Sequence, residues 1–194
     1  MRNKTPFPVS FFLGGLLLLF LFPPLVSGEE KNLFGSLQNH SLKLIWEEAL
    51  QGENLFRKGE YSGVLQKARE LSLYASGSSS ALVFAKGCED LLEAQVASRR
   101  GFDEEALRKA SEARKIFRKT SFARGNLLSL EVLLRSAHAL ELEEDRRNFE
   151  AELEENEIFQ KDPYGKGLFL LHKGIRAFES RNCPEARNFW RKSA

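Results

Sequence analysis

Residues 94–110 read AQVASRRGFDEEALRKA, and this short segment describes two helices joined by a tight turn. Gly101 interrupts the helical pattern, and Asp103 is a natural N-cap for the helix that follows. Ala97 and Ala110 are small, as residues must be where two helices cross closely. The segment therefore predicts an antiparallel helix pair.

The same spacing occurs near both ends of the mature chain. In the central copy the pattern consists of a small residue, a second packing residue, a turn residue and two anchoring residues, which are Ala94, Ala97, Gly101, Asp103 and Ala110. An earlier copy is Gly52, Leu55, Gly59, Tyr61 and Ala68. A later copy is Gly174, Ala177, Arg181, Cys183 and Trp190. The copies begin at residues 52, 94 and 174, which indicates a repeated unit of roughly 40 residues.

These segments resemble the tetratricopeptide repeat, a helix-turn-helix unit of about 34 residues. The resemblance lies in Leu55–Tyr61, Arg100–Leu107 and Gly174–Trp190. Early in the second helix the family has a small residue, which matches Ala106 and Ala186. The first unit departs with valine there, the third has no clear match, and the period is longer than the family's. The resemblance implies a right-handed α-solenoid of about four antiparallel helix pairs over residues 42–194, with a plain helical bundle as the alternative.

Composition favours an all-α fold. Residues 29–194 contain four Val, four Ile and one Thr, too few β-branched residues for a large sheet. Helical periodicity predicts helices over 42–57, 61–74, 81–98, 103–119, 126–144, 146–160, 168–180 and 184–192. Pro184 is tolerated because it falls in a first helical turn. A polar lead segment, residues 29–41, precedes these helices.

The first 28 residues have the layout of a signal peptide. Arg2 and Lys4 precede the uncharged apolar run Val9–Phe22, and small residues stand before a cut ahead of Glu29. This segment predicts export to the periplasm or the exterior. The alternative is an uncleaved anchor in the inner membrane, because the apolar run and its flanks are just long enough to span a bilayer.

Export permits a disulfide between the two cysteines. Cys88 falls within a predicted helix and Cys183 in a turn of a different unit. A disulfide needs Cα atoms within about 7 Å, so two unpaired, half-buried thiols are expected.

No pattern in the sequence indicates catalysis. His40, His138 and His172 are isolated from one another and have no metal-ligand spacing. Phosphate-binding loops, dinucleotide-binding glycines and a nucleophile elbow are absent from the sequence. We therefore expect no catalytic residue, no metal and no cofactor.

Charge is segregated along the mature chain. Residues 29–194 carry 27 bases and 27 acids, which argues against nucleic acid as a partner. Residues 99–124 nevertheless hold nine bases and four acids, whereas residues 141–157 hold nine acids and two bases. Two interpretations remain open: neighbouring helices pair these charges across a solvated seam, or a bipolar surface orients a partner protein.

The resemblance implies a concave groove lined by the first helix of each pair. Carried over by position, its candidate partner-binding residues are Trp46, Phe56, Arg57, Gln95, Arg99, Arg135 and His138. The three arginines would form a ladder suited to carboxylates of a partner. Alternatively, the two aromatic residues cap the N-terminal end of the core. The fourth pair presents an apolar face that is either covered or a docking site, formed by Leu168, Leu171, Ile175 and Phe178.

The sequence thus predicts an exported, non-enzymatic adaptor or scaffold that holds a peptide or protein of unidentified nature in its groove. The alternative is a membrane-anchored structural domain without a dedicated groove. Such a domain would self-associate through the apolar fourth pair.

Overall fold

The computed structural model describes residues 40–75 and 78–193, and their regular structure is entirely helical. The expectation of an all-α fold is confirmed for this part of the chain. In chain order the elements are α3 (His40–Arg57), α4 (Tyr61–Glu70), the 3-10 helix η2 (Leu71–Ala75), α5 (Ser79–Arg99), α6 (Asp103–Lys119), α7 (Ala123–Ala139), α8 (Glu143–Glu155), α9 (Glu157–Lys161), α10 (Pro163–Glu179) and α11 (Cys183–Ser193). The predicted signal segment, residues 1–28, and nearly all of the polar lead lie outside the described residues.

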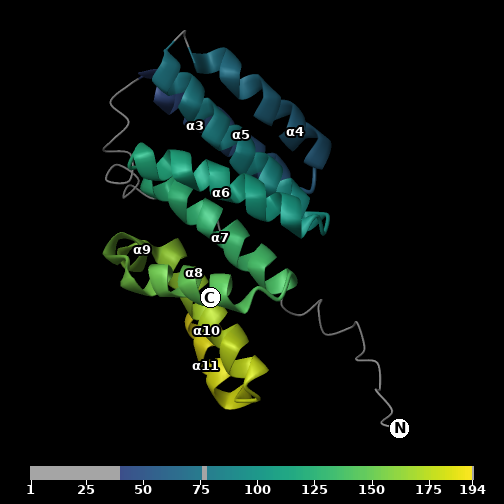
Figure 1. The fold of residues 1–194 in the computed structure, drawn as a ribbon, viewed down its shortest axis with the longest axis vertical. Helices are drawn as coiled ribbons and strands as arrows, with labels where there is room; N and C mark the ends of the chain where they lie inside the picture. Colours follow the sequence, from purple (N-terminus) through teal and green to yellow (C-terminus); the bar gives the residue numbers. More distant parts are fainter. Residues whose placement is uncertain (1–39, 76–77, 194) are drawn as a thin grey trace.

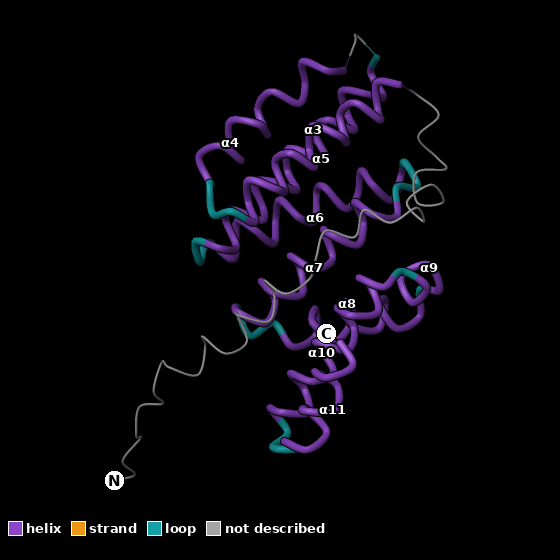
Figure 2. Tube along the Cα trace, turned by 180° about the vertical axis from the view of Figure 1, so that it is seen from behind, coloured by secondary structure: helices purple, strands orange, loops and turns teal. Residues whose placement is uncertain are grey.

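Successive helices follow one another down the long axis of the molecule (Figure 1). The helices α3, α4 and α5 form one end, α6 to α9 the middle, and α10 with α11 the other end. The same order is visible from behind (Figure 2). Close packing joins α3 to α4, α5 to α6, α6 to α7 and α10 to α11.

Five connections between helices share one backbone conformation. In each, a residue in the left-handed region follows the helix, with φ between 54° and 79°. The N–H of the next residue donates to the carbonyl five residues back, at 2.8–3.0 Å. This is a Schellman cap, which satisfies carbonyls that the helix end leaves unpaired. The left-handed residues are Gly59, Gly101, Ser121, Glu141 and Arg181.

The positions of these caps give the repeat of the fold. The central three, at 101, 121 and 141, are 20 residues apart, and the last follows after a further 40. One helix and one turn therefore occupy about 20 residues, and a pair occupies about 40. This agrees with the repeat length expected from the sequence.

The third pair is where the predicted boundaries are wrong. The sequence pattern predicts a helix over 126–144, whereas α7 ends at Ala139 and α8 begins at Glu143. The reason is Glu141, which takes the left-handed conformation although it is not glycine. Its acidic surroundings resemble the middle of an exposed helix, so the sequence contains no turn signal there. The predicted second helix, 146–160, is divided into α8 and the short α9.

Helix α6 has the predicted bounds but not the predicted N-cap, and α10 starts earlier than predicted. Asp103 is the first residue of α6, and Phe102 occupies the N-cap without a side-chain hydrogen bond. Asp103 therefore acts through the helix dipole rather than as a cap. Helix α10 begins at Pro163, five residues before its predicted start, because Asp162 caps it by accepting from Gly165 N at 2.9 Å.

The left-handed caps allow a matched test of the turn geometry. Replacing Gly101 with alanine is expected to lower the free energy of unfolding by about 1 kcal/mol, because a Cβ disfavours positive φ. Replacing Glu141 with glycine is expected to raise it by up to about 1 kcal/mol for the same reason. Urea unfolding measures both, and shifts of the same sign for the two variants would contradict the assigned conformation.

The core lies on both sides of α7. One cluster fills the space between α3, α4, α5, α6 and one side of α7. A smaller cluster on the other side of α7 contains Leu153 of α8, Phe159 of α9 and Leu168 of α10. Helix α7 thus connects the two halves of the molecule through apolar contacts.

The two cysteines are not bonded to each other. The expectation of unpaired thiols is confirmed, but neither is half-buried: Cys88 is buried in the core and Cys183 is exposed. Burial raises the pKa of the Cys88 thiol strongly, so this thiol is unreactive.

Candidate functional site

The predicted groove residues lie on α3, α5 and α7, but they differ in accessibility. Trp46 is only 2% exposed, and its ring contacts that of Phe122 edge-on, with centroids 4.6 Å apart. In the structure Trp46 is thus a core residue. Gln95 is also buried, whereas the other predicted residues are nearer the surface. We call Phe56, Arg57, Gln95, Arg99 and Arg135 the inner-face residues.

Phe56 and Arg99 form the centre of contact between α3 and α5 on this face. The guanidinium of Arg99 lies over the Phe56 ring, 5.6 Å from its centroid. Tyr61 packs beside the same ring at 5.8 Å. Burial, followed by the nearby charge of Arg135, lowers the pKa of Arg99. Arg99 and Arg135 are therefore close enough for their charges to repel.

The other two arginines of the predicted ladder already bind carboxylates. Arg57 donates to Glu53 at 2.8 Å, and Arg135 donates to Glu131. Each pair lies within one helix, four residues apart, and both acids are buried. The ladder is therefore largely neutralised, so the inner face is less cationic than its arginines alone suggest.

Tyr164 at the start of α10 belongs to this site, although the sequence analysis did not include it. Its hydroxyl donates to Glu131, and Arg124 stacks on its ring at 4.6 Å from the centroid. Burial raises the pKa of Tyr164 well above its usual value, and the charge of Glu131 adds to this effect. The sequence signal was Asp162-Pro163, which starts α10 early enough to bring Tyr164 beside α7.

Several polar atoms of this face have no hydrogen-bond partner within residues 40–75 and 78–193. They include Gln95 Oε1, Ser98 Oγ and Arg135 Nη1. Gln95 is 4% exposed, so its carbonyl oxygen is an unmatched acceptor in a region with little water. The neighbouring helices α5 and α7 therefore carry hydrogen-bonding groups on this face that contacts within the described residues leave unsatisfied.

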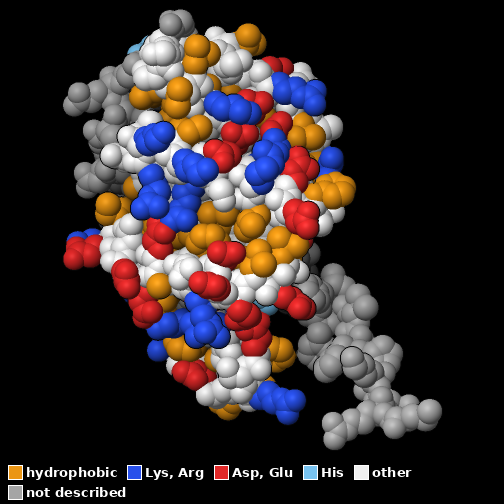
Figure 3. Space-filling view, in the orientation of Figure 1, with side chains coloured by type: hydrophobic (Ala, Val, Ile, Leu, Met, Phe, Trp, Pro, Cys, Tyr) orange, Lys and Arg blue, Asp and Glu red, His pale blue; other side chains and the backbone are white. Residues whose placement is uncertain are grey.

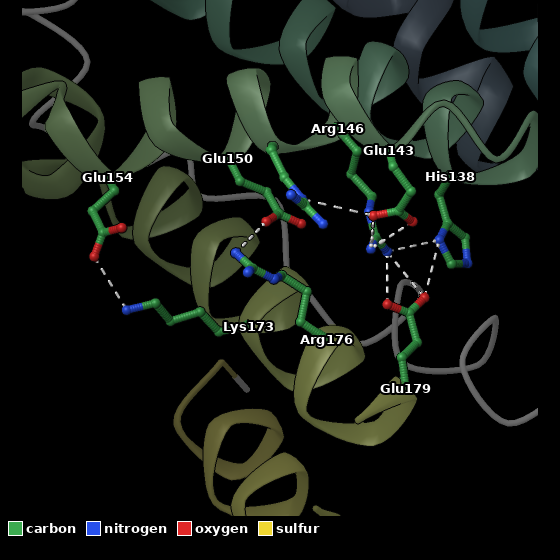
Figure 4. A network of polar contacts seen from close by, with 9 residues as sticks. His138, Glu143, Arg146, Glu150, Glu154, Lys173, Arg176 and Glu179 are labelled. Carbon is green, nitrogen blue, oxygen red and sulfur yellow. Dashed lines mark hydrogen bonds and ion pairs between the residues drawn. The ribbon is translucent and has the colours of Figure 1, made fainter. Parts of the chain in front are cut away.

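His138, one turn beyond Arg135 on α7, belongs to an ionic network with residues of α8 and α10 (Figure 4). Its Nδ1 is 3.3 Å from Arg146 Nη1 and 3.4 Å from Glu179 Oε1. The Nη1 group of Arg146 also donates to both Glu179 oxygens at 2.8 and 3.0 Å, while its Nη2 donates to Glu143. His138 therefore takes part in the joint between α8 and α10.

Arg146 occupies a position that is apolar in the other helix pairs. Five residues after the left-handed cap that joins their two helices, those pairs have Val64, Ala106 and Ala186, all fully buried. Arg146 is 6% exposed at the equivalent place. A guanidinium needs carboxylates when buried, and Glu143 and Glu179 supply them.

The acidic helix α8 pairs mainly with α10 rather than with basic α6. Glu150 accepts from Arg176 at 2.9 Å and Glu154 from Lys173 at 3.2 Å (Figure 4). Between α6 and α8 the ion pair described is that of Arg114 with Glu152. The charge-pairing interpretation of the sequence thus holds at one contact, while most exposed bases of α6 have no partner on α8.

His172 makes the stability of the fold depend on pH. It is 7% exposed on α10, and burial, helped by the charges of His138, Arg135 and Arg146, lowers its pKa to about 3. Between pH 6.5 and 3 the unfolded chain binds a proton that the folded chain excludes. Stability therefore falls as the pH falls through this range.

Replacing His172 with leucine is expected to remove this contribution. Between pH 7 and 5, wild type should lose about 2 kcal/mol of unfolding free energy relative to the variant. Urea unfolding at both pH values measures the difference. A His40→Gln variant, changed at an exposed position, should keep the wild-type pH profile. Equal pH profiles for wild type and His172→Leu would show that His172 is not buried in neutral form.

Comparison with known proteins does not assign this site. No protein-family model, no curated protein and no solved structure matches the chain. Within residues 40–75 and 78–193, no cluster of His, Cys, Asp and Glu side chains is arranged to hold a metal ion. In the same residues, no helix combines the length and apolar character needed to cross a bilayer.

Proposed function

We propose that this chain is an exported, non-enzymatic adaptor that binds a peptide or protein partner on its inner face. In this proposal the helix pairs form a right-handed, tetratricopeptide-like solenoid, and the first helices line its groove. The repeated Schellman caps and the 40-residue pair length support such an arrangement. The predicted leader supports export.

The observation that carries the proposal is that two arginines of the inner face form ion pairs within single helices rather than between helices. Some ion pairs elsewhere bridge different helices, as Lys67 of α4 does with Glu48 of α3 and Lys109 of α6 with Glu93 of α5, whereas others lie within one helix. On the inner face, Arg57 and Arg135 pair only within their own helices. These pairs do little to hold the stack together, and they retain exposure of 42% and 25% at the arginine side chains. Charged groups without such a structural role are available to a partner.

Charge reversal of this face tests the proposal. A variant with Arg57, Arg99 and Arg135 changed to glutamate is expected to lose its partner in crosslinking and capture from the native envelope. The matched control reverses three exposed bases of α6: Arg108, Arg118 and Lys119. Circular dichroism establishes that both variants fold. Unchanged capture by the inner-face variant, or equal loss in the control, would contradict the proposal.

A second candidate is a structural domain that self-associates through α10. It is favoured by Phe178, which is 47% exposed and contacts Trp190 at 5.9 Å between ring centroids. Light scattering of the purified chain in detergent measures the mass. A dimer that Phe178→Glu converts to a monomer would support this candidate, whereas a monomeric wild type would exclude it.

A further inference from the structure

One end of the molecule carries exposed aliphatic side chains, and the charge that follows them on α5, Lys86, is paired with Glu89 and Asp90. Leu73 of η2 is 79% exposed, and Leu82 and Val83 in the first turn of α5 are 47% and 50% exposed. We call these three residues the apolar tip. Ser78 N donates to Ala75 O at 3.1 Å, so η2 leads directly into the start of α5 and the three residues lie at the same end of the molecule. In Figure 3 hydrophobic side chains are visible at this upper end.

The sequence around the tip is unusual for this protein. Residues 71–85 read LSLYASGSSSALVFA and contain no Asp, Glu, Lys or Arg, although 29% of the whole chain is charged. A solvated surface normally intersperses charged residues with exposed aliphatic ones. Serine hydroxyls beside exposed leucine and valine suit the boundary between lipid headgroups and acyl chains.

The tip also lies at the end where the N-terminal segment joins the fold. Helices α3 and α4 are antiparallel, with Glu48 of α3 bound to Lys67 of α4 at 2.8 Å. The start of α3 at His40 is therefore at the same end as η2, which packs against α3. The 39 residues before His40 include the apolar run Val9–Phe22. A membrane that holds this run would be tethered to the end that carries the apolar tip.

We propose that the apolar tip inserts into the headgroup region of a lipid bilayer, with the N-terminal segment as tether, in the uncleaved form that the sequence offers as the alternative to a removed leader. Few aliphatic side chains bind lipid weakly alone, and a tether raises their effective concentration at the surface. The uncharged tip recognises apolar lipid rather than anionic headgroups, so insertion is independent of anionic lipid. The long axis of Figure 1 then stands away from the membrane, with α10 and α11 farthest from it.

Lipid quenching of a fluorescent label tests this proposal. The full chain with Cys183→Ser and Leu82→Cys is labelled with NBD and reconstituted into phosphatidylcholine vesicles, because Cys88 is buried and does not react. Nitroxide-labelled lipid is expected to reduce the emission about two-fold. The matched control labels Phe178→Cys at the opposite end, where exposure is also 47%, and its emission should not change. Adding phosphatidylglycerol should leave both results unaltered.

A variant with a charged tip provides a second test of the proposal. Leu73→Lys with Val83→Lys should abolish quenching at position 82 while the chain still sediments with the vesicles. Equal quenching at 82 and 178, or none at 82, would overturn the proposal. A label at 82 that is shielded from aqueous iodide but unquenched by lipid would indicate a protein contact and would also overturn it. Failure of the full chain to associate with vesicles would also overturn the proposal.

Discussion

Replacing Phe122 with alanine is expected to lower the free energy of unfolding by about 3–5 kcal/mol. The Phe122 ring is fully buried and meets three other aromatic rings edge-on, with centroids 4.6 Å from Trp46, 5.3 Å from Phe84 and 5.7 Å from Phe117. These rings come from α3, α5 and α6, so the cavity would open where three helices meet α7. Because each ring is held by the others, the site cannot collapse easily around the lost side chain.

The control for this prediction is Phe102→Ala. Phe102 follows the left-handed Gly101 as Phe122 follows the left-handed Ser121, so both rings occupy the same place in a Schellman cap. Phe102, however, is 58% exposed. Its replacement should cost less than about 1 kcal/mol in the same urea titration. Similar losses for the two variants would mean that Phe122 is not at the centre of the core.

Replacing Glu179 with alanine is expected to cost about 3 kcal/mol, because it leaves the buried guanidinium of Arg146 with half of its carboxylate partners. Removing both residues should cost less. The double variant Arg146→Ala, Glu179→Ala has no stranded charge, and alanine is the residue at the equivalent positions 106 and 186. We expect it to be at least about 1 kcal/mol more stable than Glu179→Ala alone.

An exposed pair from the same network is the control. Glu154 and Lys173 are 59% and 37% exposed, and Glu154→Ala should cost less than about 1 kcal/mol. Thermal or urea unfolding of the wild type and these three variants gives the comparison. A double variant less stable than Glu179→Ala would show that Arg146 is not dependent on its acidic partners.

The fold class and most helix boundaries could be predicted because their signals are local. Gly59 and Gly101 mark turns directly, and the scarcity of β-branched residues excludes a large sheet. The same cap formed by Ser121, Glu141 and Arg181 leaves no such signal. At those positions the packing of the flanking helices enforces a conformation that the residue itself disfavours. The error in the third helix pair follows from this alone.

The inner face could be predicted only in part. Spacing along helices placed Phe56 of the first pair and Arg99 of the second on one expected face, and in the structure Arg99 lies over the Phe56 ring. The buried position of Trp46, beside the Phe122 ring at the start of α7, agrees with the alternative in which Trp46 belongs to the core. Spacing did not reveal the neutralisation of the ladder by Glu53 and Glu131. Contacts across units, such as Tyr164 with Glu131, arise from tertiary packing and have no sequence period.

Photocrosslinking from the inner face tests the central claim most directly. A benzoylphenylalanine at position 56, beside Arg99, is compared with one at exposed position 102, in cells that express the full chain. The adaptor account predicts a discrete crosslinked partner from position 56 that disappears when Arg99 is changed to glutamate, and none from position 102. The same partner from position 102, or a product from position 56 that Arg99→Glu leaves unchanged, would contradict partner binding on this face.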